Sequence, residues 1–142
     1  MELLCDIVGI LGLGPIGLMC ARWYQIVGAG KILGIDNIPE QRLDQAKTDY
    51  KFQDEDVCKA IRDRLQCQSG ADVGIECAGF DHPQSWIYKV GMKLGLETDT
   101  SEILQEMVQS VQKAENILIL GIYTGYANHF PIGEIIEKSI TI

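Results

Sequence analysis

The sequence has no excess of basic residues. Its 142 residues contain 12 Lys and Arg against 20 Asp and Glu, which gives a formal net charge of −8 at pH 7. Proteins that bind nucleic acids or anionic membranes usually present a basic patch or stripe, because contacts to phosphate groups supply much of their affinity. We therefore expect neither a nucleic-acid partner nor a membrane partner.

The sequence also lacks the residue patterns of several kinds of catalytic and metal site. The five cysteines form no C-x-x-C, so neither a disulfide framework nor a zinc knuckle is indicated, and a reducing, cytoplasmic location is expected. The two histidines, His82 and His129, are 47 residues apart and are more typical of loop residues than of zinc ligands, which must converge. Neither the G-x-S-x-G of hydrolases nor a Tyr-x-x-x-Lys pair occurs. We predict no catalytic residue and no metal ligand in this chain.

Long hydrophobic runs are missing as well. The uncharged stretch Ile7–Ala21 contains four glycines and a proline, and it is too short to cross a bilayer. Glu2 and Asp6 are acidic where a secretory signal would carry basic residues. We expect neither a membrane span nor a targeting segment here.

What the chain does contain is a glycine-rich turn after an apolar segment. Ile7–Leu11 has the composition of a buried parallel strand, and a G-x-G-x-x-G follows at Gly12, Gly14 and Gly17, where a helix over Ile16–Val27 is predicted. In a dinucleotide-binding turn the first glycine permits the tight turn, the second lets a pyrophosphate approach the backbone, and the third lets the helix pack closely on the strand. The phosphates would lie at the helix N-terminus, against its N–H groups and the positive end of its dipole.

An acidic residue follows at the spacing that dinucleotide binding requires. Gly28 is predicted to end the helix in a left-handed conformation, and the apolar segment Lys31–Ile35 leads to Asp36, 19 residues after Gly17. A carboxylate at this place binds the ribose hydroxyls of NAD. The alternative, a glycine-rich turn and a solvent-facing Asp, is weaker because strand, turn, helix and acid all occur in order. Asp36 would repel a 2′-phosphate and no arginine follows before Arg42, so we predict NAD rather than NADP.

The rest of the chain alternates between predicted helices and strands. Helices are predicted over Pro39–Thr48, Asp54–Gln68, Asp99–Lys113 and Glu134–Lys138, and strands over Tyr50–Phe52, Asp72–Cys77, Ile117–Leu120 and Ser139–Ile142. The segment 81–97 has no clear period, and Trp23 and Trp86 are expected to pack in the core or at its edge. Such alternation predicts an α/β fold, a doubly wound parallel sheet of the Rossmann type with helices on both faces, in three layers. The length suits a single domain over residues 1–142.

Taken together, these motifs resemble the coenzyme domain of the zinc-type medium-chain alcohol dehydrogenases. The resemblance is carried by Gly12–Leu18, by the strand that leads to Asp36, and by Ala71–Gly79, Ile117–Tyr123 and Phe130–Ile142. The segment between Gly79 and Ser101 looks most like the glutathione-independent formaldehyde dehydrogenase branch. The resemblance covers essentially the whole chain but only the coenzyme domain of the family, so the domain that holds the catalytic zinc is expected to be absent from this chain.

The resemblance implies which residues contact the pyrophosphate of NAD. Gly12, Gly14 and Gly17 would line the pyrophosphate. Pro15 and Ile16 would supply the amides at the start of the helix.

It also implies which residues contact the two nucleosides. Asp36 would hold both hydroxyls of the adenosine ribose, and Arg42 stands one position beyond the usual place of a basic ribose contact. Ala78 and Gly79 would flank the adenosine half. Backbone groups for the nicotinamide carboxamide would come from Leu120, Gly121 and Ile122.

The function implied is that of an oxidoreductase domain. It would position the nicotinamide for hydride transfer from an alcohol or aldehyde hydrate that zinc holds in the absent domain. Alone, the chain is predicted to bind NAD and to be inactive. The family joins subunits through the strand that corresponds to Ser139–Ile142, which predicts a homo-oligomer. The alternative is a stand-alone dinucleotide-binding or dimerisation module; a methyltransferase is less favoured, because its glycine loop usually lacks the third glycine.

Overall fold

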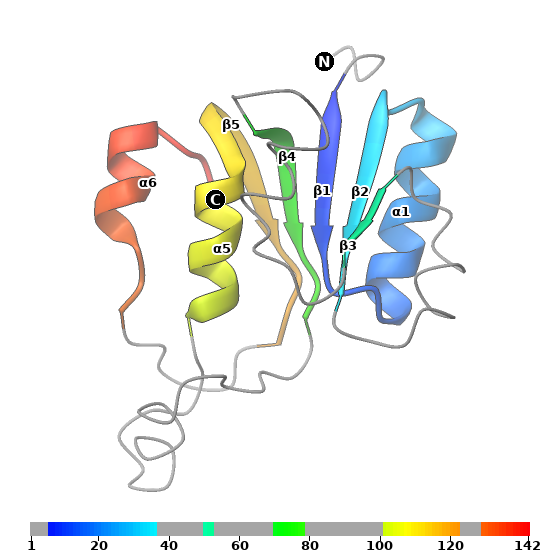
Figure 1. Ribbon diagram of the computed structural model, residues 1–142, viewed down its shortest axis with the longest axis horizontal. Helices are drawn as coiled ribbons and strands as arrows, with labels where there is room; N and C mark the ends of the chain where they lie inside the picture. Colours follow the sequence, from blue (N-terminus) through cyan, green and yellow to red (C-terminus); the bar gives the residue numbers. More distant parts are fainter. Residues whose placement is uncertain (1–5, 37–49, 53–69, 79–100, 123–128) are drawn as a thin grey trace, which may run out of the picture.

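The computed structural model describes residues 6–36, 50–52, 70–78, 101–122 and 129–142. The elements in these ranges are β1 (Ile7–Leu11), α1 (Pro15–Val27), β2 (Lys31–Ile35), β3 (Tyr50–Phe52), β4 (Ala71–Glu76), α5 (Glu102–Ser110), β5 (Val111–Ile119) and α6 (Ile132–Lys138) (Figure 1). The helices predicted over Pro39–Thr48 and Asp54–Gln68, the segment 81–97 and Trp86 lie outside the described residues. No helix in the described ranges is long and apolar enough to cross a membrane.

A single parallel sheet organises these elements. Its strand order is β3-β2-β1-β4-β5, and every pairing between neighbours is parallel. β1 lies in the middle, with Val8 opposite Ile32 of β2 on one side and opposite Val73 of β4 on the other. The chain therefore builds outward from β1 through β2 to β3 and then crosses back to build outward through β4 to β5. The doubly wound α/β fold predicted from the sequence is confirmed.

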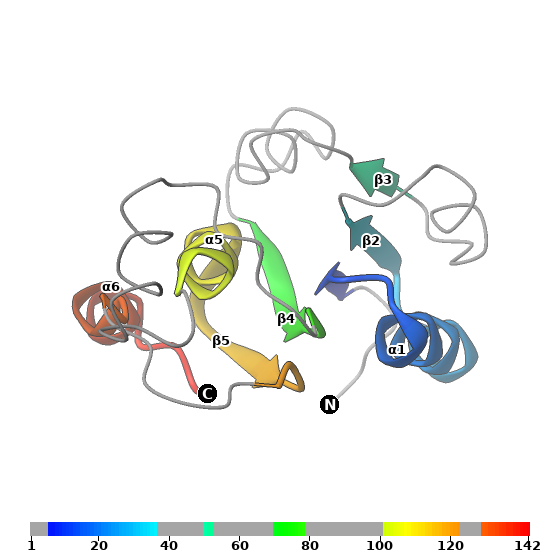
Figure 2. The same cartoon turned by 90° about the horizontal axis from the view of Figure 1, so that it is seen from below.

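Helices cover the two faces of the sheet. α1 lies against one face and α5 against the other, so the view along the strands shows three layers (Figure 2). α6 packs beside α5, since Ile135 shares a buried cluster with Met107 and Val108. This placement follows from right-handed crossovers, which put the helices on opposite faces when the direction of winding reverses.

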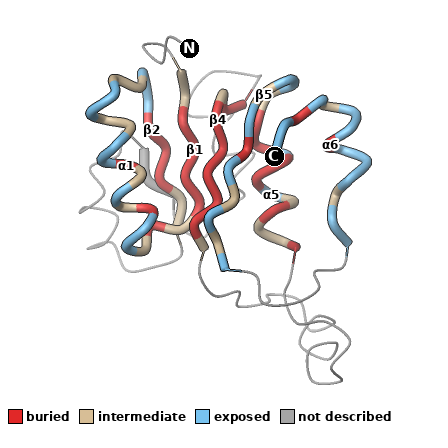
Figure 3. The backbone as a smooth tube through the Cα atoms, turned by 180° about the vertical axis from the view of Figure 1, so that it is seen from behind, coloured by how far each residue is buried: buried red, intermediate tan, exposed pale blue. Residues whose placement is uncertain are grey.

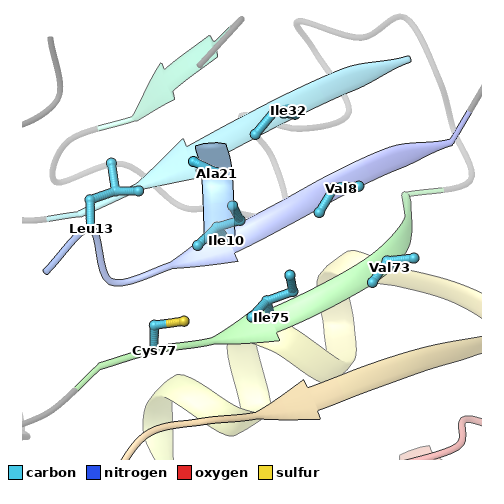
Figure 4. Close-up of a cluster of buried hydrophobic side chains, with 8 residues drawn as sticks. All are labelled: Val8, Ile10, Leu13, Ala21, Ile32, Val73, Ile75 and Cys77. Atoms are coloured by element: carbon cyan, nitrogen blue, oxygen red, sulfur yellow. The ribbon is translucent and has the colours of Figure 1, made fainter. Parts of the chain in front are cut away.

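Two apolar clusters fill the spaces between the layers. The cluster under α1 joins side chains of β1, β2 and β4, and of the turns after β1 and β4, to Ala21 of the helix (Figure 4). Its members are Val8, Ile10, Leu13, Ala21, Ile32, Val73, Ile75 and Cys77. The cluster under α5 and α6 consists of Leu11, Met107, Val108, Val111, Ile117, Ile135 and Ile140. The central strands are accordingly buried along most of their length (Figure 3). Successive side chains of a strand point to opposite faces, which is why neighbouring Ile10 and Leu11 belong to different clusters.

Helix α1 has the predicted boundaries, within one residue. It starts at Pro15, whose fixed φ suits the first helical position, and Gly28 ends it with φ 85° and ψ 36°. The Ala29 N–H donates to the Tyr24 carbonyl oxygen at 3.0 Å, which completes the left-handed cap. The predicted cap at Gly28 is confirmed.

The prediction that Trp23 packs in the core or at its edge is wrong. Its side chain is 63% exposed, whereas Ala21 is fully buried under the helix. At 3.6 residues per turn, two residues correspond to a rotation of about 200°, so Trp23 points away from the sheet when Ala21 points toward it. Met19 and Ile26 share this outer face and are 73% and 64% exposed.

The helix predicted over Asp99–Lys113 ends earlier, at Ser110. Val111 is extended and pairs with Ala71, and the register then shifts so that Val73 pairs with Asn116. The Lys138 ammonium donates to three carbonyl oxygens at this helix end, those of Val108 (2.6 Å), Gln109 (3.0 Å) and Val111 (3.0 Å). Val111 is buried in the cluster under α5, so the apolar period continues past the point where the backbone leaves the helix.

The strand predicted over Ser139–Ile142 is reduced to a single bridge. Ser139 ends α6 in the left-handed region, with φ 55°. Thr141 then bridges Asn116 in parallel, with the Ile117 N–H donating to the Thr141 carbonyl at 2.8 Å and the Thr141 N–H donating to the Glu115 carbonyl at 3.0 Å. This segment therefore extends the sheet beyond β5 by one residue pair. Pairing of subunits at this edge stays a prediction.

The packing predicts unequal costs for the same substitution at two sites. Ile75 is completely buried in the cluster under α1, whereas Ile136 of α6 is 71% exposed. Ile75→Ala is expected to lower the free energy of unfolding by about 2–5 kcal/mol, because it removes buried methyl groups and leaves a cavity. Ile136→Ala is expected to change it by less than about 0.5 kcal/mol. Urea unfolding followed by circular dichroism measures both, and equal losses would contradict this assignment of the core.

Candidate functional site

The carboxyl ends of four parallel strands meet at one edge of the sheet. Figure 1 shows the loops that leave β1, β4 and β5 at the same end of the strands, where α1 also begins. The predicted site residues at this edge lie in the turns after β1, β2, β4 and β5 and in the first turn of α1: Gly12, Gly14, Pro15, Ile16, Gly17, Asp36, Ala78, Leu120, Gly121 and Ile122. Arg42 and Gly79 lie outside the described residues. In doubly wound sheets this edge, where the winding reverses between β1 and β4, is where ligands bind.

Gly12 forms the turn after β1 in a conformation that favours glycine. Its φ is 86°, in the left-handed region. A Cβ at this position would lie 2.8 Å from the nitrogen and 2.9 Å from the Cα of Ala78, so the two backbones are in direct contact. The Gly12 N–H also donates to the Ile35 carbonyl at 2.9 Å. The glycine turn is thus fixed between the ends of β2 and β4, and the predicted role of Gly12 in a tight turn is confirmed.

Gly17 lets the first turn of α1 approach the glycine turn. A Cβ on Gly17 would lie 1.9 Å from the Gly12 carbonyl oxygen and 3.6 Å from the Cβ of Cys77. No L side chain fits at the shorter of these distances without moving the helix. The predicted role of the third glycine in close packing is confirmed, and the surface it contacts is mainly the backbone of the turn.

The start of α1 is open where a ligand would approach. Gly14 is the N-cap, and a Cβ built on it would meet no atom within 4 Å. Pro15 has no N–H, which corrects the expectation that it supplies an amide; the amides of the first turn come from Ile16 and Gly17. The first turn contains no acidic residue, and Ile16 is 46% exposed. A helix start of this kind attracts an anion through its N–H groups and its dipole.

Asp36 lies beside the same turn at the end of β2. Its Oδ2 accepts a hydrogen bond from the backbone N–H of Leu13, which is fully buried. The carboxylate is half-buried. Leu13 and Asp36 are 23 residues apart in the sequence. The parallel pairing of β1 with β2 brings the acid to the glycine turn.

Glu76 is a residue of this edge that the sequence interpretation missed. It is the last residue of β4, it is completely buried, and its carboxylate accepts hydrogen bonds from two different turns. The Ala78 N–H donates to Oε1 at 2.7 Å, and the Gly121 N–H donates to Oε2 at 3.2 Å. The main-chain oxygen of Glu76 also accepts from Leu120 at 2.7 Å and from Gly121 at 3.1 Å. A carboxylate placed directly after the uncharged run Val73–Ile75, at the end of a buried strand, is the signal that could have identified it.

Two cysteines lie under this edge. Cys77 is buried and Cys20 of α1 is half-buried, and both are free thiols. Burial raises the pKa of Cys77 to about 12, with further contributions from the neighbouring Cys20, which also hydrogen-bonds to it, and from Glu76. Cys77 is therefore a neutral packing residue at physiological pH, as expected from the sequence. The described residues contain no group of three or more His, Cys, Asp or Glu that could hold a metal ion.

The curated proteins that match this chain are both zinc-type alcohol dehydrogenase-like proteins. No protein-family model matches the chain. A zinc-type alcohol dehydrogenase-like protein of Schizosaccharomyces pombe is 38% identical over 143 residues, covering 96% of this chain and 33% of that protein. An uncharacterized zinc-type alcohol dehydrogenase-like protein of Bacillus subtilis is 31% identical over 142 residues, covering 96% of this chain and 37% of that protein. The chain thus spans about a third of the length of the curated relatives it matches.

Solved structures share the fold. An alcohol dehydrogenase from Thermotoga maritima gives a TM-score of 0.77 at 22% identity, over 99% of this chain and 35% of that chain. A Sinorhizobium meliloti protein described as a putative zinc-binding dehydrogenase, solved with NADP bound, gives a TM-score of 0.75 at 20% identity, over 99% of this chain and 37% of that chain. These likenesses show the Rossmann-type fold of one part of larger dehydrogenases.

The site geometry predicts opposite effects for Ala at two helical glycines. Gly17→Ala is expected to lower the free energy of unfolding by about 1–3 kcal/mol, because its methyl group overlaps the Gly12 carbonyl. Gly133→Ala in α6 meets no atom within 4 Å and is expected to be neutral or to stabilise by up to about 1 kcal/mol, since Ala is the better helix former. Urea denaturation measures both variants. A Gly17→Ala protein as stable as Gly133→Ala would contradict the close approach of helix and turn.

The raised pKa of Cys77 predicts a pH dependence at alkaline pH. The thiol keeps its proton in the folded state up to about pH 12, whereas its ordinary value is 9.0. Between these values the unfolded state releases the proton first, so this group lowers the free energy of unfolding as the pH rises, and it has no effect below them. Cys77→Ala should flatten this part of the pH dependence relative to the wild type. Urea unfolding of both proteins between about pH 8 and 11 measures the difference, and parallel curves would contradict the prediction.

Proposed function

We propose that this chain is the NAD-binding domain of a zinc-type alcohol dehydrogenase-like protein. One observation carries the proposal: the glycine turn after β1 lies in backbone contact with the turn after β4, beside the open N-terminus of α1 and the carboxylate of Asp36. This arrangement occurs at the edge where a doubly wound sheet binds a dinucleotide. Two zinc-type alcohol dehydrogenase-like proteins are similar to this chain over about a third of their own length, which supports the proposal.

The pyrophosphate would bind at the start of α1. Gly14 leaves space for it, and the N–H groups of Ile16 and Gly17 would donate to its oxygens. Because the first turn has no acidic residue, nothing in that turn opposes the attraction between the helix dipole and the phosphates. The turn needs no side chain for this task, since backbone N–H groups make the contacts.

The adenosine ribose would bind at Asp36. The Leu13 N–H holds one oxygen of this carboxylate, Oδ2, which fixes its orientation beside the turn. Two ribose hydroxyls are donors that a carboxylate accepts well, whereas a 2′-phosphate beside it would be repelled. We therefore propose that NAD is preferred to NADP. The neighbour that was solved with NADP is 20% identical, so its likeness concerns the fold.

The nicotinamide would extend toward the turns after β4 and β5. Leu120, Gly121 and Ile122 stand after β5 and would contact it through their backbone groups, whereas Ala78, after β4, would flank the adenosine half. When bound, the nicotinamide supplies the acceptor for a hydride. We propose that zinc and a small alcohol or aldehyde bind in the part of the relatives that this chain does not cover, so that the chain alone binds coenzyme without turnover. The formaldehyde dehydrogenase branch stays a prediction, because it depends on a segment outside the described residues.

Calorimetric titration of the purified chain with NADH and NADPH tests the proposal. NADH is expected to bind saturably, and NADPH about 10-fold or more weakly, as the loss of charge-assisted hydrogen bonds implies. Asp36→Asn should lower the affinity for NADH and reduce the difference in affinity between NADH and NADPH, since it removes the charge but keeps an oxygen for the Leu13 N–H. Glu134→Gln, which removes an exposed carboxylate on α6, is the matched control and should change neither affinity. Absence of NADH binding by the folded chain would contradict the proposed function.

A further inference from the structure

The buried carboxylate of Glu76 lies at the end of β4, at the carboxyl edge of the sheet where the coenzyme would bind. Taking a carboxylate out of water is costly unless hydrogen bonds replace the lost hydration. Glu76 is completely buried and accepts hydrogen bonds from Ala78 and Gly121 at 2.7 and 3.2 Å. These two residues belong to separate turns, one after β4 and one after β5. The carboxylate therefore links the two turns that would contact the coenzyme.

The contact with Gly121 is tight enough to determine the residue at that position. A Cβ on Gly121 would lie 2.2 Å from Oε2 of Glu76 and 2.7 Å from the carbonyl oxygen of Ala78. Its φ lies outside the left-handed region, so the close approach of the Glu76 carboxylate and the Ala78 carbonyl oxygen, and not the backbone conformation, accounts for the glycine. The Glu76 side chain thus packs directly against the turn after β5.

The same link extends to the glycine turn. Ala78, whose N–H is held by Oε1 of Glu76, contacts Gly12 through its backbone, as does the carbonyl carbon of Cys77. A shift of Ala78 would therefore change its backbone contact with Gly12 and, through the Glu76 carboxylate, the contact with Gly121. Through these two hydrogen bonds, of 2.7 and 3.2 Å, a single side chain contacts both Ala78 and Gly121.

The other end of β4 provides a comparison. Asp72 also joins neighbouring strands through its carboxylate, accepting from the Ile7 N–H at 2.6 Å and from the Gln112 side chain amide at 2.7 Å. That end is the amino edge of the sheet, away from the candidate site, and Asp72 is only half-buried. β4 thus carries a bridging carboxylate at each end, and only the one at the binding edge is completely buried.

We propose that Glu76 is a positioning residue for the dinucleotide: its carboxylate fixes the distance between the turns after β4 and β5, and thereby the backbone groups of Ala78 and Gly121 that contact the coenzyme. The inference rests on the proposed function. Strand pairing does not require the carboxylate, because the main-chain oxygen of Glu76 already accepts from Leu120 and Gly121. What the side chain adds is a fixed orientation of the turns.

Calorimetric titration of the full chain with NADH and with ADP-ribose tests this role. In Glu76→Gln the side chain keeps its size but exchanges one acceptor oxygen for an NH₂ group, so one of the two backbone N–H groups loses its side-chain acceptor and faces a donor instead. The dissociation constant for NADH is expected to rise about 10-fold, in line with the loss of a buried hydrogen bond. The rise for ADP-ribose should be smaller, because this ligand lacks the nicotinamide that would lie near Gly121. The fluorescence gain of bound NADH should fall as well.

Asp72→Asn is the matched control, since it alters a bridging carboxylate on the same strand. It is expected to lower stability without changing either dissociation constant by more than about twofold. Gly121→Ala is the second variant, because its methyl group would overlap the Glu76 carboxylate and the Ala78 carbonyl oxygen, and so alter the spacing of the two turns while the carboxylate is kept. It should reproduce the selective loss for NADH, and it tests the proposal if Glu76→Gln does not fold.

The outcomes separate the two proposals. Failure of the wild-type chain to bind NADH would contradict the proposed function itself. Wild-type binding of NADH together with unchanged affinity in a folded Glu76→Gln or Gly121→Ala protein would overturn the positioning role and leave the function intact. Equal losses for NADH and ADP-ribose in Asp72→Asn would likewise overturn it, because the effect would then follow stability and not position.

Discussion

The backbone contact between Gly12 and Ala78 is the constraint on which the candidate site depends. It brings the turn after β1 against the turn after β4, so close that a Cβ on Gly12 would lie 2.8 Å from the Ala78 nitrogen. Gly17 then lets α1 start directly on this turn. Each glycine is needed because backbone meets backbone, where no side chain could move aside. The open start of α1 and the carboxylate of Asp36 take their places from this contact.

Hydrogen bonds extend this constraint across the carboxyl edge of the sheet. Leu13 is held by Asp36 on the β2 side, and Ala78 is held by Glu76, which also holds Gly121 on the β5 side. The turns of four strands are therefore coupled through two carboxylates and one backbone contact. Such an edge is prepared before a ligand arrives, which reduces the entropy lost on binding.

The sequence was sufficient to predict the features that depend on neighbouring residues. β1, the glycine turn, α1 with its Gly28 cap, and β2 each have local signals, and the structure confirms them. The end of α5 was missed because Val111 continues the apolar period of the helix while its backbone pairs with β4. Glu76 was missed because its role depends on Gly121, 45 residues away, and no local pattern reports that contact. Features that depend on residues close together in the sequence could therefore be predicted, whereas features that depend on contacts between distant residues could not.

The most direct test of the account is the mapping of NADH binding on the ¹⁵N-labelled chain by NMR. If the carboxyl edge of the sheet binds the coenzyme, saturable shifts should concentrate in the amides of the glycine turn, the first turn of α1, Asp36, Ala78 and Gly121. The amides of α6 and of the amino ends of the strands should change little. Shifts that do not saturate, or that concentrate on α6 or the outer face of α1, would contradict the assignment of this edge as a dinucleotide site.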